Sequence, residues 1–381
     1  MVKPLENVRV LDLSRYMAGP FCGKILVDLG ADVIKVEAPW GDEMRFMPPL
    51  VGRFSPTFID LNRGKRGVTL NLKTEKGVKI FMELLRESDI VIENFSVGTL
   101  DRLGIGYEEM KKVNPKVILA SITGFGQYGP RSESHSFDMI GQAASGYMHL
   151  NAVEASQATG KETPPTLLPE ALGDSIPGAY AALCILAALN YRNITGEGMH
   201  VDVAQQDVMI YHSLSLPQYM ATGITFPESR IMYPFGVYRT FKARDGGIAI
   251  AAPNGPVLER LATLLGKEEI DDGDVEEWVG DRSLVELMEA LTGNDIPATP
   301  VYDLDDVVGD PQSRAREMIT EVEHPGFGAV KVTGIPLKSP ELDLKVERSA
   351  PDLGQHNAEI LMGVLGYDLS EIGELKKEGV I

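Results

Sequence analysis

The sequence from residue 7 to residue 37 opens with Asn7-Val-Arg-Val-Leu-Asp-Leu13 and ends with Ala31-Asp-Val-Ile-Lys-Val-Glu37. Both runs are short, apolar and rich in β-branched residues, which is typical of buried strands. Between them, Gly19 to Leu29 is predicted to form a helix. A strand, a helix and a second strand in this order predict a parallel βαβ unit.

The same alternation continues to residue 123. Further strands are predicted at 66–72, 89–93 and 116–123, and further helices at 74–87 and 107–113. Alternating strands and helices are typical of the α/β class, in which helices cover both faces of a mostly parallel sheet. The N-terminal part of the chain is therefore predicted to form such a sheet.

The chain beyond residue 137 is predicted to be mainly helical at first. Helices are expected at 137–148, 177–191 and 205–219, with a short strand at 199–203. Residues 222–233 are polar and contain Gly, Pro and Ser, which is typical of a linker. The later predictions are strands at 236–240 and 247–252, helices at 256–265, 283–291, 304–308 and 311–318, a solvated acidic loop at 268–277, a strand pair at 321–332, and helices at 356–365 and 370–377.

The composition indicates a soluble globular protein. The chain has 381 residues, of which 44% are hydrophobic. Its N-terminus lacks the apolar core of a signal peptide, so we expect a cytoplasmic protein in which Cys22 and Cys184 are reduced. The formal net charge of −19 argues against nucleic acid or an anionic membrane as the main partner. The cysteines and histidines show no metal-binding spacing, so no metal is expected.

A carboxylate precedes the most apolar helix of the chain, in Glu170-Ala-Leu-Gly-Asp-Ser-Ile-Pro-Gly178. Pro177 is predicted to lie in the first helical turn, where its missing N–H costs nothing. Ser175 or Asp174 could then cap the free N–H groups. Because a helix that is apolar on all sides is normally buried, Asp174 is expected to lie deep in the protein. The pattern alone favours a capping Asp174 over a nucleophile that the helix N-terminus keeps ionised.

The first βαβ unit carries only part of the dinucleotide-binding fingerprint. Glu37 lies where a ribose-binding carboxylate would be expected, but Gly19 and Gly23 do not have the G-x-G-x-x-G spacing. Pro20 also removes an N–H group that would face phosphate. An NAD-dependent oxidoreductase therefore stays a minor alternative. The sequence lacks a G-x-S-x-G elbow and a Walker loop, which argues against the usual hydrolases and phosphoryl-transfer enzymes.

Several separated motifs, taken in order, point to one enzyme family. They are Val10–Leu13 with Ala18-Gly-Pro20, Leu29–Glu37, Gly41-Asp42, Asn62–Arg66, Glu93-Asn-Phe95, Leu100–Gly104, Asn114-Pro115, Ile122–Gly126, Gly173-Asp174, Leu186–Leu189, Thr195–Gly198 and Asp352–His356. Through these motifs the chain resembles the class III (family III) CoA-transferases, which also include the 2-methylacyl-CoA racemases. The resemblance raises a catalytic role for Asp174 above the capping role.

The resemblance implies an interlocked homodimer and a Rossmann-like large domain that is built from both chain ends. A smaller α+β domain would be inserted between them. The large, CoA-binding domain would comprise residues 1–220 and 325–381, and the small domain residues 221–324. The implied partners are an acyl-CoA, which brings coenzyme A as part of the substrate, and a carboxylic acid.

The resemblance also implies a mechanism and a set of site residues. Asp174 would attack the acyl-CoA thioester to give an aspartyl anhydride, and CoA would then convert the anhydride into an aspartyl-CoA thioester. An incoming carboxylic acid would reverse these two steps and leave as the new acyl-CoA. His135 stands where a transferase relative has a basic residue, and Ala38 replaces a basic residue of some relatives. By position in matching motifs, the CoA site would be lined by Arg15, Met17, Ala18, Leu70, Lys73, Asn94, Phe95, Arg102 and His135.

Two alternatives within the resemblance stay open. A racemase needs two bases, in those relatives a His and an Asp. This chain has Phe137 at the place of that His, with His135 two residues away, so the transferase is favoured. A non-catalytic CoA-binding subunit is the second alternative, and the presence of Asp174 argues against it. Formyl-CoA:oxalate transferases carry a Gln at the position of Met17, so an acid less polar than oxalate is expected.

Overall fold

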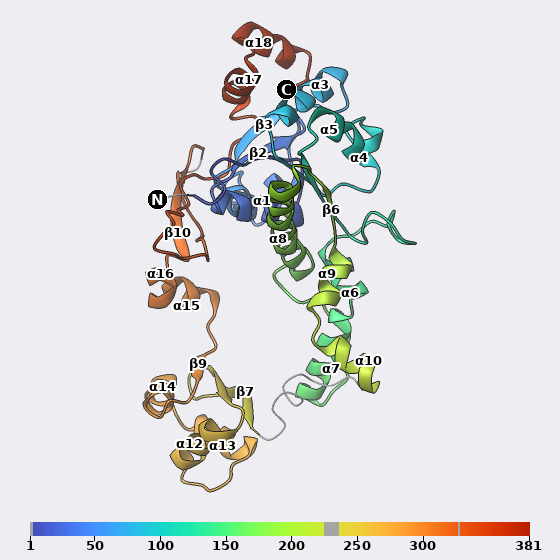
Figure 1. Cartoon of the computed structure of the whole chain (residues 1–381). Helices are drawn as coiled ribbons and strands as arrows, with labels where there is room; N and C mark the ends of the chain where they lie inside the picture. Colours follow the sequence, from blue (N-terminus) through green and yellow to red (C-terminus); the bar gives the residue numbers. More distant parts are fainter. Residues whose placement is uncertain (1–2, 225–235, 327) are drawn as a thin grey trace. The chain divides into compact units, whose positions relative to one another are not determined.

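The fold is described for residues 3–224, 236–326 and 328–381 of a computed structural model (Figure 1). Contacts within the chain divide it into two compact units. The large unit contains Met1–His149, Thr166–Ser213 and Ala315–Ile381, and the small unit contains Leu150–Pro165 and Leu214–Arg314. The domain boundaries at residues 220 and 325 that the sequence suggests stay a prediction.

Six parallel strands form the sheet of the large unit, in the order β3-β2-β1-β4-β5-β6. In the middle of the sheet, Val10 of β1 lies opposite Val33 of β2 on one side and Ile90 of β4 on the other. The predicted parallel sheet is confirmed, and the predicted strand near residue 200 forms its edge. The strands are β1 (Arg9–Asp12), β2 (Asp32–Glu37), β3 (Arg66–Thr69), β4 (Ile90–Glu93), β5 (Ile118–Thr123) and β6 (His200–Ala204).

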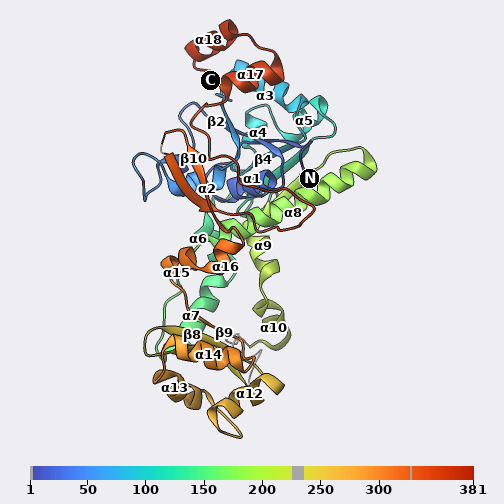
Figure 2. The same cartoon turned by 90° about the vertical axis from the view of Figure 1, so that its left-hand side faces the viewer.

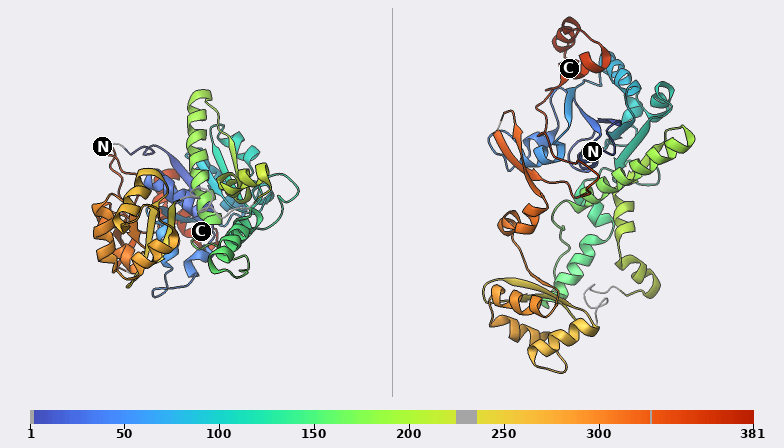
Figure 3. Two further views of the ribbon diagram at one scale, coloured as in Figure 1. Left: turned by 90° about the horizontal axis from the view of Figure 1, so that it is seen from below. Right: turned by 60° about the vertical axis from the view of Figure 1, so that its left-hand side comes forward.

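Successive strand residues enter two different apolar cores, one on each face of the sheet. Val10 and Ile90 pack with α1 and α8 on one face, whereas Leu11 and Val91 pack with α3, α5, α17 and α18 on the other. The helices α17 and α18 come from the C-terminal end, so both chain ends build this unit. Figures 2 and 3 show α8 as the long light-green helix beside the sheet. The helices are α1 (Ala18–Asp28), α3 (Glu75–Arg86), α5 (Tyr107–Val113), α8 (Leu172–Thr195), α17 (Asn357–Leu365) and α18 (Leu369–Lys377).

An antiparallel strand pair, β10 with β11, contributes a third core of the large unit. Val322 and Val332 of this pair pack with Phe58 and Ile59 of α2. The predicted strand pair at 321–332 is thereby confirmed. The remaining elements of this unit are η1 (Glu43–Phe46), α2 (Pro56–Asn62), α4 (Thr99–Arg102), α6 (Asp138–Ala144), α9 (Gln205–His212), β10 (Ile319–His324) and β11 (Gly328–Thr333).

The small unit has an antiparallel three-stranded sheet, in the order β7-β8-β9. Phe241 and Ile248 of the sheet pack with Leu261 of α12, Val279 of α13 and Leu287 of α14. The other elements outside the large sheet are α7 (Tyr147–Thr159), α10 (Ser215–Thr222), β7 (Val237–Lys242), β8 (Gly247–Ala252), α12 (Gly255–Leu265), α13 (Asp272–Gly280), α14 (Leu284–Gly293), β9 (Ala298–Pro300), α15 (Leu304–Gly309) and α16 (Pro311–Ala315).

Two predicted helices are each divided in the structure, and the predicted acidic loop is partly helical. The helix expected at 137–148 is α6 followed by α7, because Gly146 takes a left-handed conformation with φ of 89°. The helix expected at 205–219 is α9 followed by α10. Asp271 and Asp274 form a capping box at the start of α13, and acidic side chains stabilise a helix N-terminus. Residues 225–233 of the predicted linker lie outside the described residues.

The start of α8 is also corrected. The helix begins at Leu172, not at Pro177, which lies inside it. Neither Ser175 nor Asp174 caps the helix, and the N-cap residue Ala171 supplies no side-chain cap. In the described part of the chain, α8 is the one helix that is long and apolar enough to cross a membrane by length and composition. Half of its most apolar 18-residue stretch is buried, where it packs against α1 and the sheet.

Buried ion pairs lie beneath the start of α1. Lys65 Nζ is 2.7 Å from Asp12 Oδ2 and donates to Asn62 Oδ1 at 2.9 Å, and both charged side chains are fully buried. Lys35 forms a second fully buried pair with Asp42 at 3.0 Å. A Cβ atom on Gly23 would come within 2.9 Å of Lys65 Nζ, so this glycine serves the packing of α1 on the ion pair. The Lys65 and Lys35 ammonium groups outweigh the effect of burial and lower the pKa of Asp12.

Removing one partner of the Lys65–Asp12 pair should destabilise the protein more than removing both. Lys65→Met leaves the Asp12 carboxylate buried with one cation fewer, and breaking a buried pair in this way costs about 3–5 kcal/mol. The double variant Lys65→Met with Asp12→Asn should recover part of that loss, because no uncompensated charge is left. Unfolding in urea, followed by circular dichroism, measures both. A double variant less stable than Lys65→Met would contradict this account.

Candidate functional site

The sheet has its topological switch point between β1 and β4. The chain leaves β1 toward α1 and leaves β4 toward α4, so a crevice opens at the carboxyl ends of these neighbouring strands, where ligands of such sheets bind. Two cavities lie there, of about 230 Å³ and about 520 Å³. We call them the first and the second cavity. Arg15, Phe95 and Thr99 line both, so the two cavities adjoin.

The loop after β1 is held in a strained conformation at the border of the two cavities. Tyr16 has a φ of 62°, which costs a non-glycine residue about 1–3 kcal/mol. Asn94, in the loop after β4, holds Arg15, the residue before Tyr16, through both of its backbone groups. Asn94 Oδ1 accepts from Arg15 N at 2.8 Å, and Asn94 Nδ2 donates to Arg15 O at 2.7 Å. The buried Lys35 donates to Ser14 O at 2.9 Å, and Asp42 accepts from Tyr16 N at 3.3 Å. These contacts fix the backbone that leads to Met17.

The first cavity combines an exposed aromatic ring with a cation. Trp40 is 57% exposed, and Lys73 Nζ lies 5.7 Å from the centre of its ring. Leu70 and Ala38 add apolar surface to the same cavity. An aromatic face, a neighbouring ammonium group and an apolar wall suit a nucleotide that carries phosphate.

A contact from α6 holds the start of α8 at the second cavity. The Asp138 carboxylate accepts from Gly173 N at 2.7 Å, which satisfies an N–H group that the helix itself leaves unpaired. A Cβ atom on Gly173 would lie 2.5 Å from Asp138 O, so only glycine allows α6 to approach this closely. The following residue, Asp174, is thereby placed in the wall of the second cavity.

Asp174 is 8% exposed as a residue, and its carboxylate has one side-chain partner that the structure identifies. Gln205, the first residue of α9, donates from Nε2 to Asp174 Oδ1. Gln205 Oε1 accepts in turn from Ser136 Oγ at 2.6 Å. Burial, and secondarily the nearby charge of Asp138, raise the pKa of Asp174 from its ordinary value of 3.8 to about 7, although the bond from Gln205 acts in the other direction. Asp174 is therefore a carboxyl group that ionises near neutral pH.

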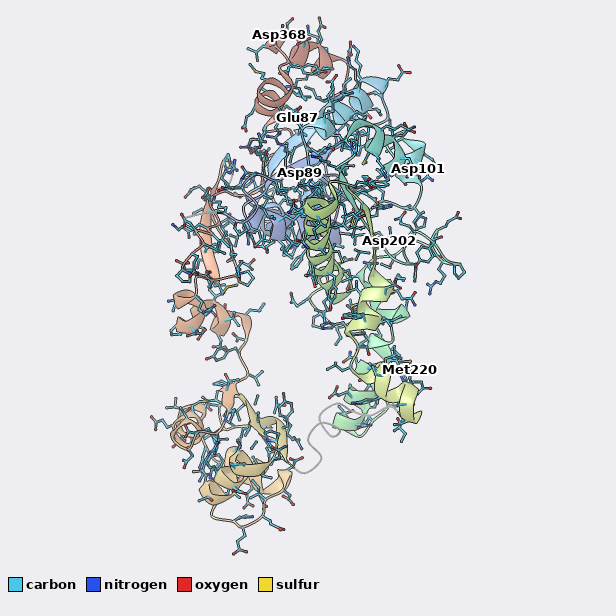
Figure 4. The ribbon with its side chains drawn as sticks, viewed as in Figure 1. Glu87, Asp89, Asp101, Asp202, Met220 and Asp368 are labelled. Atoms are coloured by element: carbon cyan, nitrogen blue, oxygen red, sulfur yellow. The ribbon has the colours of Figure 1, made fainter. Side chains whose placement is uncertain are left out.

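A second buried carboxyl group, Glu93, supports the loop after β4. It accepts from Phe95 N at 2.8 Å at the end of the strand. Burial raises its pKa to about 7; its bonds to Ser121 and Phe95 N lower the pKa, and the charge of Asp202 raises it. Asp202, which Figure 4 labels, lies in β6. Glu93 is not among the residues that line either cavity, so its role here is to hold the loop.

The structure brings most of the predicted site residues together at this crevice. Arg102 is the exception: it lies on α4 outside both linings, where it donates to Thr99 Oγ1 at 2.8 Å. His135 Nδ1 is 3.4 Å from Ser96 Oγ. The second cavity contains Met17, Ala18, Asn94, His135 and Asp174, the first contains Leu70 and Lys73, and both contain Arg15 and Phe95.

Four residues of the site were not predicted from the sequence: Trp40, Ser136, Asp138 and Gln205. Trp40 directly precedes the Gly41-Asp42 motif, which was the available signal. Asp138 and Gln205 contact the start of α8, and Ser136 contacts Gln205; these segments are distant in sequence, so no local pattern identifies the three residues. Within the described residues, no group of three or more His, Cys, Asp or Glu side chains is arranged to hold a metal ion.

Comparison with known proteins gives one consistent result. The family model of CoA-transferase family III matches residues 5–357. The chain is 34% identical to a formyl-CoA:oxalate CoA-transferase of Streptomyces avermitilis, across 100% of both chains. It is 34% identical to the human succinyl-CoA:glutarate CoA-transferase, across 100% of this chain and 90% of the relative. The crystal structure of a CAIB/BAIF family protein from Brucella suis is similar with a TM-score of 0.84 and 32% identity, across 96% of this chain and 100% of that one.

Replacing Asp174 by Asn should stabilise the protein in alkaline solution and not in acid. The pKa of Asp174 is about 7 in the folded protein and near 3.8 in the unfolded chain, so the folded state binds the proton more tightly. Stability therefore falls as pH rises from about 4 to 7, by at most about 4 kcal/mol for a difference of about three pKa units. Asp174→Asn removes this loss. Its melting temperature should exceed that of the unmodified protein by several degrees at pH 8, with equal values at pH 4; equal values at both pH values would contradict the raised pKa.

Proposed function

Because the chain belongs to the family III CoA-transferases, we propose that it moves coenzyme A from an acyl-CoA thioester to a carboxylic acid, with Asp174 as the nucleophile. The observation that carries this proposal is the placement of Asp174. A buried carboxyl group at a helix start lines a cavity that adjoins a nucleotide-sized one. The named relatives are transferases that act on acyl-CoA and carboxylic acids, which supports the same reaction here.

The two cavities suggest how an acyl-CoA binds. The adenine ring and the 3′-phosphate would occupy the first cavity, where Trp40 offers a π face and Lys73 a positive charge. The pantetheine arm would pass Arg15 and Phe95, which line both cavities. Its thioester would then reach the second cavity, where Asp174 lies.

The proposed reaction has four steps. Asp174 Oδ2 attacks the thioester carbonyl carbon, which releases CoA thiolate and leaves a mixed aspartyl anhydride. The thiolate attacks Asp174 Cγ, which releases the donor acid and leaves an aspartyl-CoA thioester. The acceptor carboxylate then attacks Cγ, which releases CoA thiolate and leaves a second mixed anhydride. The thiolate finally attacks the acceptor acyl carbon, which forms the new acyl-CoA and frees Asp174. Each step exchanges one acyl bond for another, so no ATP and no external proton donor is needed.

Burial of Asp174 suits this chemistry in two ways. A carboxylate that is poorly solvated is a stronger nucleophile, and its raised pKa reports that loss of solvation. Exclusion of bulk water protects the anhydride from hydrolysis. Because the nucleophile must be ionised, the rate should increase as pH rises through about 7.

The racemase alternative has less support from the site. Phe137, at the start of α6, presents an aromatic ring that packs edge-on against Tyr16, with 5.6 Å between ring centres. It cannot take a proton. His135 lines the same cavity as Asp174 and is the base that a racemase would have to use. α-Hydrogen exchange of a 2-methylacyl-CoA in deuterated water, lost in His135→Ala, would favour this alternative.

The acceptor acid and the homodimer also belong to the proposal. Met17 and Tyr16 give the second cavity an apolar side, which suits an acid less polar than oxalate.

Large apolar side chains lie exposed on the outer faces of α8 and α9, among them Ile194 at 77% and Tyr211 at 78%. A second copy of the chain would cover such surface, as the proposed interlocked dimer requires.

Asp174 should become covalently modified during turnover. With succinyl-CoA and hydroxylamine present, the aspartyl anhydride or thioester should be captured as a hydroxamate at Asp174, and borohydride should reduce the thioester to homoserine. Peptide mass spectrometry identifies the site. Glu93 is the internal control, because it is a second buried carboxyl group with a pKa near 7 and should stay unmodified. CoA transfer that continues in the Asp174→Ala variant would contradict the proposed mechanism.

Lys73 should distinguish coenzyme A from its 3′-dephospho form. Lys73→Ala should weaken CoA binding about tenfold, because one charge-assisted contact to phosphate is lost, while binding of dephospho-CoA changes little. Lys76 provides a matched control: it pairs with Glu378 on the surface and lies outside both cavity linings, so Lys76→Ala should leave both affinities unchanged. Isothermal titration of the unmodified protein and the two variants with both ligands measures these affinities. Equal weakening of both ligands in Lys73→Ala would place the 3′-phosphate elsewhere.

A further inference from the structure

The amide of Gln205 faces the one oxygen of Asp174 that keeps its carbonyl character during the proposed reaction. We propose that Gln205 is a catalytic residue: its Nε2–H group stabilises the oxyanion that forms on Asp174 Oδ1 each time the aspartyl carbonyl is attacked. This inference rests on the proposed function, since it concerns the intermediates that Asp174 would form.

The orientation of the Gln205 amide is fixed at both ends. Its Nε2 donates to Asp174 Oδ1, and its Oε1 accepts from Ser136 Oγ at 2.6 Å. An ionised carboxylate only accepts hydrogen bonds, so the nitrogen of the amide must face Asp174. The hydroxyl of Ser136 then holds the oxygen on the other side. Gln205 is itself only 5% exposed, so water does not compete for its donor.

The charge in the two middle steps develops on the atom that this donor contacts. When CoA thiolate adds to Asp174 Cγ, the new C–S bond forms and the carbonyl electron pair moves onto Oδ1. The tetrahedral species then collapses: the pair returns from Oδ1, and the bond from Cγ to the bridging oxygen breaks to release the donor carboxylate. In the third step the acceptor carboxylate adds to Cγ of the thioester, and the carbonyl electron pair again moves onto Oδ1. Its return breaks the C–S bond and releases CoA thiolate. In both steps the Gln205 N–H lies where the negative charge appears, as in an oxyanion hole.

The first and the last step differ in this respect. There the nucleophile attacks the acyl carbon of the substrate, and the charge appears on the substrate's carbonyl oxygen. The Gln205 donor is bonded to Oδ1 of Asp174 and not to that oxygen. Loss of the donor should therefore slow the two middle steps selectively, whereas loss of a residue that only positions Asp174 would slow all four.

Gln205→Met tests this, because Met is close in length and flexibility and lacks a donor. Gln206→Met is the matched control: its Nε2 donates to Ala144 O at 2.9 Å, and it lies outside both cavity linings. Two rates are measured by mass spectrometry with succinyl-CoA as donor. One is net CoA transfer to an acceptor acid such as glutarate. The other, without acceptor, is exchange of isotope-labelled CoA into succinyl-CoA, which needs only the first step and its reversal.

In Gln205→Met, net transfer should fall about 10²–10³-fold, as for loss of one oxyanion donor, while isotope exchange falls less than about threefold. Ser136→Ala keeps the donor but frees the amide to rotate, so it should show the same selectivity with a smaller loss, about tenfold. Gln206→Met should change neither rate. Melting temperature and CoA affinity show that the variants are folded.

Two results would overturn the role of Gln205: transfer and exchange that fall together, which indicates that Gln205 only positions Asp174, or transfer that stays unchanged. Both leave the proposed function intact, because the unmodified protein still transfers CoA and Asp174→Ala does not. An unmodified protein that shows neither transfer nor exchange with any acyl-CoA overturns the proposed function, and the role of Gln205 with it.

Discussion

The hydrogen bond from Gly173 N to the Asp138 carboxylate is the contact on which the site depends. It fixes the first turn of α8, which Pro177 weakens because a proline cannot donate to the carbonyl of Gly173. The same carboxylate contributes, after burial, to the raised pKa of Asp174. One side chain of α6 thus holds the helix start that carries the proposed nucleophile, and it adds to the rise in pKa that burial causes.

Much of the architecture follows from the sequence. Short β-branched runs that alternate with helical segments predict the parallel sheet, and the apolar run after Asp174 predicts a buried helix whose start carries a carboxylate. The prediction fails where contacts join distant segments. Pro177 favours a helix start at its own position, but Asp138, which is 35 residues before Gly173, moves the start to Leu172. The sequence does not predict the role of Gln205 for the same reason, since only the packing of α9 on α8 brings its amide to Asp174.

The crevice at the switch point is built on buried charges. The buried pairs of Lys65 with Asp12 and of Lys35 with Asp42 lie under the loop after β1, and Lys35 also binds its backbone. Such pairs contribute little net stability, because desolvation offsets their attraction. Their value lies in holding the loop in which Tyr16 takes a left-handed conformation and Arg15 lines both cavities. Under the proposed function, rigidity of this loop would hold the two ends of a bound acyl-CoA at a fixed separation.

The packing of α17 and α18 on the sheet has a consequence for biosynthesis. The strands from β1 to β5 leave the ribosome first, yet one of their faces receives Ile360, Leu361 and Leu375 from the last helices. Until these helices are synthesised, that apolar face lacks part of its cover and is a target for chaperones or for aggregation. Native contacts between the two chain ends also have a high sequence separation, which slows folding. The order of synthesis thus delays completion of the large unit's core until α17 and α18 have left the ribosome.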